Sequence, residues 1–130
     1  MEPIQCSDDL VLLFRDVLTR VGDKWSLFVV YRLGDSTRRF SELHKEVEGI
    51  SERMLTVTLR SLERDGLITR TVFPVVPPRV DYKLTELGTS LLAIVESLFR
   101  WTAKHTGDLV HARDEYDSRV AEDFVPAGSG

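Results

Sequence analysis

The segment from Ser51 to Asp65 carries the side chains in this sequence that are best suited to recognising another molecule. At about 100° per residue along a helix, one face collects Arg53, Thr56, Val57, Arg60 and Arg64, with Ser51 at the start. A guanidinium fork binds phosphate or a guanine edge through paired hydrogen bonds, and Thr and Val methyl groups can contact a thymine methyl. The pattern therefore indicates a helix that reads double-stranded DNA.

The same face also fits a plainer interpretation, a solvated helix surface with pairs of side chains one turn apart. Glu63 lies near Leu59 and Arg60, and Glu52 lies near Thr56, a spacing at which helical side chains meet. The opposite side of this helix is expected to face the core and carries Met54, Leu55, Thr58, Leu59 and Leu62.

The charge along the chain favours a basic surface in the same region. The net charge is -4, yet residues 38–80 carry eight Lys and Arg against six Asp and Glu, and seven of those cations are arginines. Arg38 and Arg39 precede a short helical segment that begins at Ser41, where free backbone N–H groups suit a phosphate. A basic middle segment in a chain of negative net charge permits local anion binding but does not by itself establish it.

Residues 74–78 are rich in proline and lie between two stretches of residues that favour β-strands. Proline has no backbone N–H to donate to a sheet, so this segment is predicted to be the connecting loop. The pair predicts a β-hairpin with a stiff, protruding tip that is flanked by Arg70 and Arg79. A cation at that place reaches phosphates or the minor groove of DNA. The alternative for Arg79 is an ion pair with Asp81, two residues along the chain.

Apolar periodicity and capping residues predict the elements that must position these side chains. The helix at 24–33 is apolar almost all round, so we expect it at the centre of the core. Two short helices joined by a turn with glycine, then a longer helix and a hairpin, give the order of a winged helix-turn-helix. We expect helices over 8–22, 24–33, 41–47, 52–65 and 86–106, a weaker one over 109–120, and strands over 38–40, 67–73 and 79–84, with Ser7, Asp23, Ser41, Ser51 and Thr85 as helix caps.

The last long helix carries two adjacent apolar stripes, one more than a helix needs to pack on its own domain. One stripe steps through Leu87, Leu91, Ile94, Leu98 and Trp101, and the other through Leu92, Val95 and Phe99. The second stripe indicates a partner helix. We therefore expect a homodimer held by this helix and the one at 8–21, through Leu13, Val17, Leu91, Ile94, Val95, Leu98 and Trp101.

Composition and motif content exclude several classes of protein. A chain of 130 residues, 42% hydrophobic and 29% charged, is typical of one ordinary domain. No apolar run reaches the length of a membrane span, and the N-terminus lacks a signal peptide. A single cysteine excludes an internal disulfide, and the histidines and acids fit no common metal spacing. There is no Gly-rich phosphate loop or serine nucleophile motif, so we do not expect an enzyme or a cofactor. From the metal spacing, the single cysteine and the N-terminus described above, we expect no metal and a cytoplasmic location.

The sequence resembles the HxlR family of winged-helix transcription regulators, relatives of the MarR-type regulators, over roughly residues 12–105. The resemblance implies a homodimeric, sequence-specific DNA-binding protein, with the 51–65 helix in the major groove and the 74–79 loop as the wing. It is carried by Gly22-Asp23-Lys24-Trp25, Arg39-Phe40-Ser41-Glu42-Leu43, Ile50-Ser51-Glu52-Arg53-Met54-Leu55-Thr56, Leu59-Arg60-Ser61-Leu62-Glu63-Arg64-Asp65-Gly66-Leu67, Pro77-Pro78-Arg79-Val80-Asp81-Tyr82 and Leu84-Thr85-Glu86-Leu87-Gly88.

Two departures from the family pattern limit what is carried over. Many members have Gln-Arg after the Leu-Thr of this helix, where this chain has Val57 and Thr58, so their base preference does not transfer. Many also have a Cys-Pro pair before the first helix as a redox or electrophile sensor, and that place holds Leu12 and Leu13 here. Cys6 lies six residues upstream and is the candidate redox sensor, although a lone terminal cysteine more often has no such role.

The predicted fold is mainly α with a small β-hairpin wing (α+β), a winged helix-turn-helix with N- and C-terminal dimerisation helices. Residues 1–121 are expected to form the DNA-binding domain with its dimerisation helices, and 122–130 a flexible tail. The predicted function is that of a dimeric transcription regulator on an inverted-repeat operator in double-stranded DNA, without a membrane partner. A small-molecule or redox effector is left open. The alternative is a winged-helix protein-interaction module without specific DNA binding.

Overall fold

The computed structural model describes residues 7–123, apart from the side chains of residues 21 and 22. Cys6 and residues 124–130 of the expected tail lie outside the described residues, whereas residues 122 and 123 are helical. The chain divides between Val95 and Glu96 into two compact units. The first unit contains the sheet, four helices and the first half of a fifth, and the second contains the rest of that helix and the last one.

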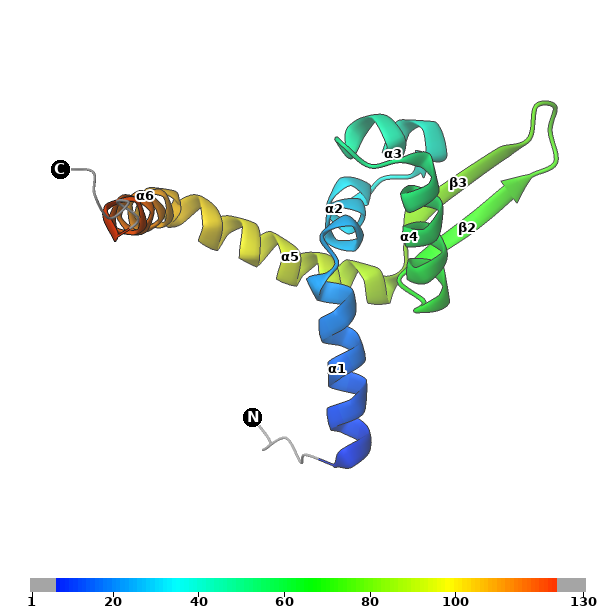
Figure 1. The fold of residues 1–130 in the computed structure, drawn as a ribbon. Helices are drawn as coiled ribbons and strands as arrows, with labels where there is room; N and C mark the ends of the chain where they lie inside the picture. Colours follow the sequence, from blue (N-terminus) through cyan, green and yellow to red (C-terminus); the bar gives the residue numbers. More distant parts are fainter. Residues whose placement is uncertain (1–6, 124–130) are drawn as a thin grey trace. The chain divides into compact units, whose positions relative to one another are not determined.

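The order of helices and strands confirms the predicted winged helix-turn-helix (Figure 1). Helices dominate, and the three strands form one small antiparallel sheet. The elements are α1 (Asp8–Gly22), α2 (Lys24–Leu33), β1 (Arg38–Arg39), α3 (Phe40–Glu46), α4 (Glu52–Arg64), β2 (Ile68–Phe73), β3 (Arg79–Leu84), α5 (Glu86–Lys104) and α6 (Thr106–Asp123).

Short polar side chains begin most of these helices as the sequence predicted. The side chain of Ser7 accepts the Leu10 N–H at 3.2 Å, and that of Ser51 accepts the Met54 N–H at 3.0 Å. Each bond satisfies one of the backbone donors that a helix start leaves open.

The expected cap at Ser41 is wrong, because α3 begins one residue earlier, at Phe40. The Glu42 carboxylate accepts the Arg39 N–H at 3.0 Å and so closes the helix start from within its first turn. Ser41 therefore lies inside α3, and Phe40 is helical rather than the end of a strand.

The hairpin of β2 and β3 builds the wing. The sheet order is β1-β3-β2, and the hairpin register runs from Ile68 opposite Leu84 to Phe73 opposite Arg79. β1 pairs with the other edge of β3, which places Arg39 opposite Asp81. In the first unit, the end of the hairpin projects clear of α3 and α4 (Figure 1).

The core of the first unit lies between α2, α4 and the sheet. It is formed by Val29, Val30, Leu33, Leu43, Val47, Ile50, Leu55, Leu59, Leu62, Leu67, Ile68, Tyr82, Leu84 and Leu92. α2 is not buried all round as expected, because Phe28 is 51% and Tyr31 is 37% exposed. Met54 is 40% exposed, since it lies at the edge of the apolar face of α4 and not at its centre.

The start of α5 is fixed to the turn that follows α4. The Thr85 hydroxyl donates to the Gly66 carbonyl at 2.6 Å and accepts the Gly88 N–H at 3.0 Å. The Thr85 N–H also donates to the Leu67 carbonyl at 3.0 Å. α5 thus approaches the backbone of residue 67 at Gly88, where only hydrogen fits.

Candidate nucleic-acid interface

α4 separates an apolar side from a basic side as its sequence predicted. Leu55, Thr58, Leu59 and Leu62 are buried, so the helix cannot rotate without exposing them. The predicted recognition residues lie on the other side: Arg53, Val57, Arg60 and Arg64 are exposed, and Thr56 is half-buried. Burial of one face therefore fixes which side chains α4 presents to solvent.

The arginines of this face keep their donors available. Within residues 7–123, none of Arg53, Arg60 and Arg64 forms an ion pair. The Thr56 hydroxyl donates to the Glu52 backbone carbonyl at 2.9 Å and so keeps its own acceptor capacity. A face whose cations are not neutralised by neighbouring carboxylates attracts an external anion more strongly than one with internal pairs.

The two arginines before α3 differ in their availability. Arg38 Nε lies 3.1 Å from Glu46 Oε2, and both side chains are about one third exposed. Arg39 is exposed and forms no ion pair in the described part of the chain. Ser41 is exposed in the first turn of α3. Of the two arginines, Arg39 is therefore the one free to meet a phosphate.

Arg79, the arginine of the wing, forms the ion pair with Asp81 that the sequence offered as the alternative to DNA binding. Arg79 donates from Nε to Asp81 Oδ1 at 3.0 Å and from Nη2 to Asp81 Oδ2 at 2.9 Å, a bidentate pair. The hydrogen bonds from Arg79 hold the pKa of the Asp81 carboxyl below its ordinary value, and the same pair raises the pKa of Arg79. The Arg79 guanidinium also lies 5.1 Å from the centre of the Phe73 ring. Much of its charge is thus neutralised locally, whereas Arg70 on β2 is exposed and has no ion pair among residues 7–123.

The predicted dimerisation residues fall into two groups. Five are exposed: Leu13 and Val17 on α1, and Ile94, Leu98 and Trp101 on α5. Leu91 and Val95 are partly buried instead, because they pack against the core of the first unit. α1 is exposed along nearly its whole length, with Leu12, Leu13 and Phe14 each 58–60% exposed.

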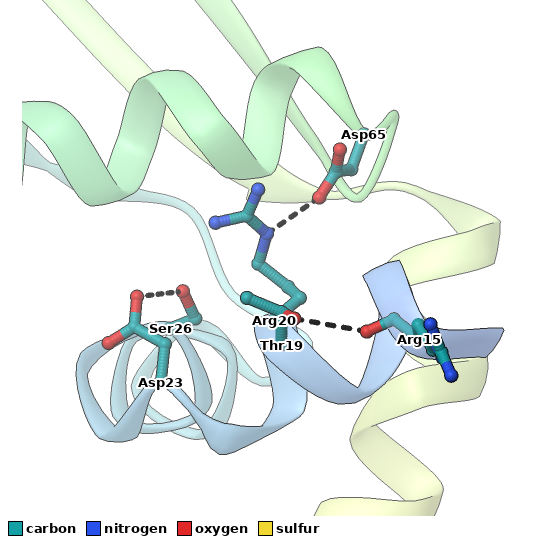
Figure 2. Close-up of polar contacts among 6 residues, drawn as sticks. All are labelled: Arg15, Thr19, Arg20, Asp23, Ser26 and Asp65. Atoms are coloured by element: carbon teal, nitrogen blue, oxygen red, sulfur yellow. Dashed lines mark hydrogen bonds and ion pairs between the residues drawn. The ribbon is translucent and has the colours of Figure 1, made fainter. Parts of the chain in front are cut away.

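A groove of about 780 Å³ lies between α1, the end of α4 and the first half of α5, with Leu13, Val17, Leu67, Leu87, Leu91 and Ile94 among its lining residues. Arg20 and Asp65 also line it, and Arg20 Nε lies 2.7 Å from Asp65 Oδ2. Figure 2 shows this side chain reaching from the end of α1 to the residue after α4. The ion pair thus joins the candidate dimerisation helix to the end of the candidate recognition helix.

Comparison with known proteins assigns the fold to a family. The family model described as HxlR-like helix-turn-helix matches residues 20–109 of this chain, which include α4 and the wing. The chain belongs to the HxlR family. This confirms the resemblance seen in the sequence.

Proteins named as transcriptional or redox regulators match most of the chain. YtfH of Escherichia coli (strain K12), named an HTH-type transcriptional regulator, is 39% identical over 101 residues, which are 78% of this chain and 80% of YtfH. The structure of a transcriptional regulator, ytfH of Salmonella typhimurium, matches with a TM-score of 0.71 and 38% identity, over 77% of this chain and 89% of that one. The redox regulator HypR in its reduced form matches with a TM-score of 0.71 and 37% identity, over 75% and 97% of the two chains.

Membership of the HxlR family makes this protein a helix-turn-helix transcriptional regulator and not an enzyme. Among residues 7–123, no cluster of three metal-binding side chains is present. In the same part of this HxlR-family chain, no helix is long and apolar enough to cross a membrane.

Two features of the interface region escaped the sequence analysis. Arg20 and Asp65 are 45 residues apart, and neither belongs to a motif or a periodic pattern that would pair them. The second feature is the exposure of the Val75 and Val76 side chains at the wing tip. The prolines of this segment predicted a loop but not which of its side chains are exposed. The absence of charged residues at the end of a predicted protruding hairpin was the signal that could have indicated an exposed apolar tip.

Proposed function

We propose that this HxlR-family regulator is a cytoplasmic homodimer that binds double-stranded DNA sequence-specifically, with α4 in the major groove. The observation that carries the proposal is the basic side of α4, whose three arginines are exposed and unpaired among the described residues. Arg53 and Arg60 read or flank bases, and Thr56 and Val57 contact base edges between them. Arg64 lies at the end of the same face.

Backbone contacts set the position of this helix on the duplex. Arg39 and the first residues of α3 and α4, including Ser41 and Ser51, contact phosphates. Arg38 and Arg79 add weaker contacts through the N–H groups that their carboxylate partners leave free. The 74–79 segment lies along the backbone or the minor groove as a wing.

The dimer is formed by the exposed faces of α1 and α5. Leu13, Val17 and Ile94 line the apolar groove of the first unit, and Leu98 and Trp101 continue the same stripe of α5. Large exposed apolar surfaces of this kind mark association sites. A two-fold dimer carries two copies of α4 in opposite directions, so its operator is an inverted repeat with half-sites about 34–36 Å apart or a multiple of that distance.

Effector control remains a separate proposal from DNA binding. HypR is named a redox regulator. In this chain any thiol chemistry falls to Cys6, the single cysteine, because the family's usual sensor position holds Leu12 and Leu13. An intramolecular disulfide is therefore excluded as the switch.

Selection of bound duplexes from a random pool, followed by titration of the selected and scrambled sequences, tests the proposed function. We expect enrichment of one inverted repeat, tighter binding to it than to the scrambled duplex, and a loss of affinity with salt for both. Absence of any sequence preference would instead favour a winged-helix module that binds protein.

A further inference from the structure

The tip of the wing is apolar and exposed to solvent. Residues 72–78 read Val-Phe-Pro-Val-Val-Pro-Pro and contain no charged or polar side chain. Val76 is 100% exposed and Val75 is 52% exposed. The tip projects beyond α3 and α4 in the first unit (Figure 1). A continuous apolar segment held in water at the end of a hairpin indicates an interaction site.

The tip is also held in one shape before it meets a partner. Three prolines restrict the backbone of the loop, and the Val75 N–H donates to the Phe73 carbonyl at 2.9 Å. At the base of the loop, Phe73 lies opposite Arg79, whose guanidinium covers the Phe73 ring and binds Asp81. A rigid tip loses little conformational entropy when it inserts into a partner.

The charges around the tip favour DNA as that partner. Arg70 and Arg79 are the only charged residues between 66 and 80. Asp81 neutralises much of the charge of Arg79, so Arg70 is the cation of the hairpin that is exposed and without an ion pair among residues 7–123. An uncharged tip on a hairpin that carries such a cation matches a minor groove, where the bases form the floor and phosphates form both walls. The position of the wing beside the basic α4 places it on the same duplex in the proposed complex.

We infer that the wing tip is an apolar wedge: Val76, supported by Val75, enters the minor groove, partly unstacks one base step and bends the operator. The inference rests on the proposed DNA binding and adds a bending activity to it. Apolar side chains that enter the minor groove kink a duplex by about 20–90° toward the major groove. Pyrimidine–purine steps unstack most easily, so the wedge selects such a step beside each half-site without a hydrogen bond to its bases.

Val76→Ser tests the wedge, with Val110→Ser on α6 as the control. Val76 contributes nothing to the core, and Val110 is 52% exposed, so neither change removes a buried side chain. The probe is a duplex selected by the full-length protein, with 2-aminopurine at the steps flanking each half-site and a fluorophore at each end. Energy transfer between the ends reports bending, and 2-aminopurine fluorescence reports unstacking.

We expect the unaltered protein and Val110→Ser to bend the duplex by at least about 20° and to raise 2-aminopurine fluorescence. Val76→Ser should lose both signals and bind several-fold more weakly, with its preference inside the half-sites unchanged. Equal bending and unstacking by Val76→Ser would overturn the wedge and assign the tip to a different partner, such as a protein. Binding of the selected duplex by the unaltered protein without any bend would also overturn it, yet leave the proposed function standing. Failure to select any duplex would instead remove the proposed function itself.

Discussion

Replacement of Gly88 by alanine tests how α5 is joined to the DNA-binding unit. A Cβ at this position would overlap the Leu67 carbonyl oxygen and would lie 3.0 Å from the Leu67 carbonyl carbon and 3.1 Å from Leu84 Cδ2. Two of these neighbours are backbone atoms, which cannot rotate away as a flexible side chain would. α5 or the turn after α4 must therefore shift.

The expected loss follows from three contributions of different sign. Overpacking in a well-packed core costs about 1–3 kcal/mol. A shift of the Leu67 carbonyl also weakens its 3.0 Å bond from the Thr85 N–H, a bond that contributes about 1 kcal/mol. The higher helix propensity of alanine returns about 1 kcal/mol. We expect Gly88→Ala to lower the free energy of unfolding by about 1–3 kcal/mol.

Urea unfolding followed by circular dichroism, at one fixed protein concentration, measures this change. A loss of about 2 kcal/mol lowers the midpoint by about 1 M if the slope is about 2 kcal/mol/M. Gly107→Ala is the matched control, because a Cβ at residue 107 meets no heavy atom within 4 Å. Gly107→Ala should leave stability unchanged or slightly higher. A Gly88→Ala midpoint equal to that of the unaltered protein would refute the close approach of α5 to residue 67.

Four further predictions concern the dimer, the operator, the wing and the pH dependence of stability. Ile94→Glu places a charge on a side chain that is 65% exposed on the proposed dimer face; sedimentation should show more monomer, and an unchanged dimer would place the interface elsewhere. Insertion of about five base pairs between half-sites turns one of them to the far side of the duplex, so dimer affinity should fall towards its value for random DNA; no change would contradict the symmetry argument. Asp81→Asn releases Arg79 from its bidentate pair and should tighten binding to all sequences with a steeper salt dependence, which unaltered salt titrations would contradict. Because the pKa of Asp81 is lowered in the folded state, the stability that its ionised form contributes is present above about pH 4 and is lost as pH falls through the lowered value, a loss that Asp81→Asn should not show.

Local signals in the sequence were sufficient for most of the fold. Ser7, Asp23 and Ser51 cap their helices in the structure as the sequence predicted, because a cap is a contact between residues two or three apart. The turn glycines Gly34 and Gly66 adopt positive φ after α2 and α4. Such short-range features depend little on the rest of the chain.

Choices between alternative partners were not predictable in the same way. The sequence offered Arg79 either DNA or Asp81. In the structure β3 begins at Arg79, so the side chains of residues 79 and 81 project to the same face of the strand and form the ion pair. Arg20 and Asp65 meet only because the fold brings the ends of α1 and α4 together. Phe28 was expected in the core and is exposed, since periodicity shows which faces are apolar but not which of them the same chain covers.

The specificity profile of Arg60→Ala tests the central claim, that the basic side of α4 reads the operator. Binding of the selected duplex and of each single base-pair variant would be measured for this variant and for Arg113→Ala, which removes an exposed arginine from α6. Loss of a bidentate base contact should cost Arg60→Ala about 1–3 kcal/mol and relax the preference at one position in each half-site. Arg113→Ala should keep the full profile. An Arg60→Ala profile that matches that of Arg113→Ala in both affinity and base preference would contradict the assignment of α4 as the recognition helix.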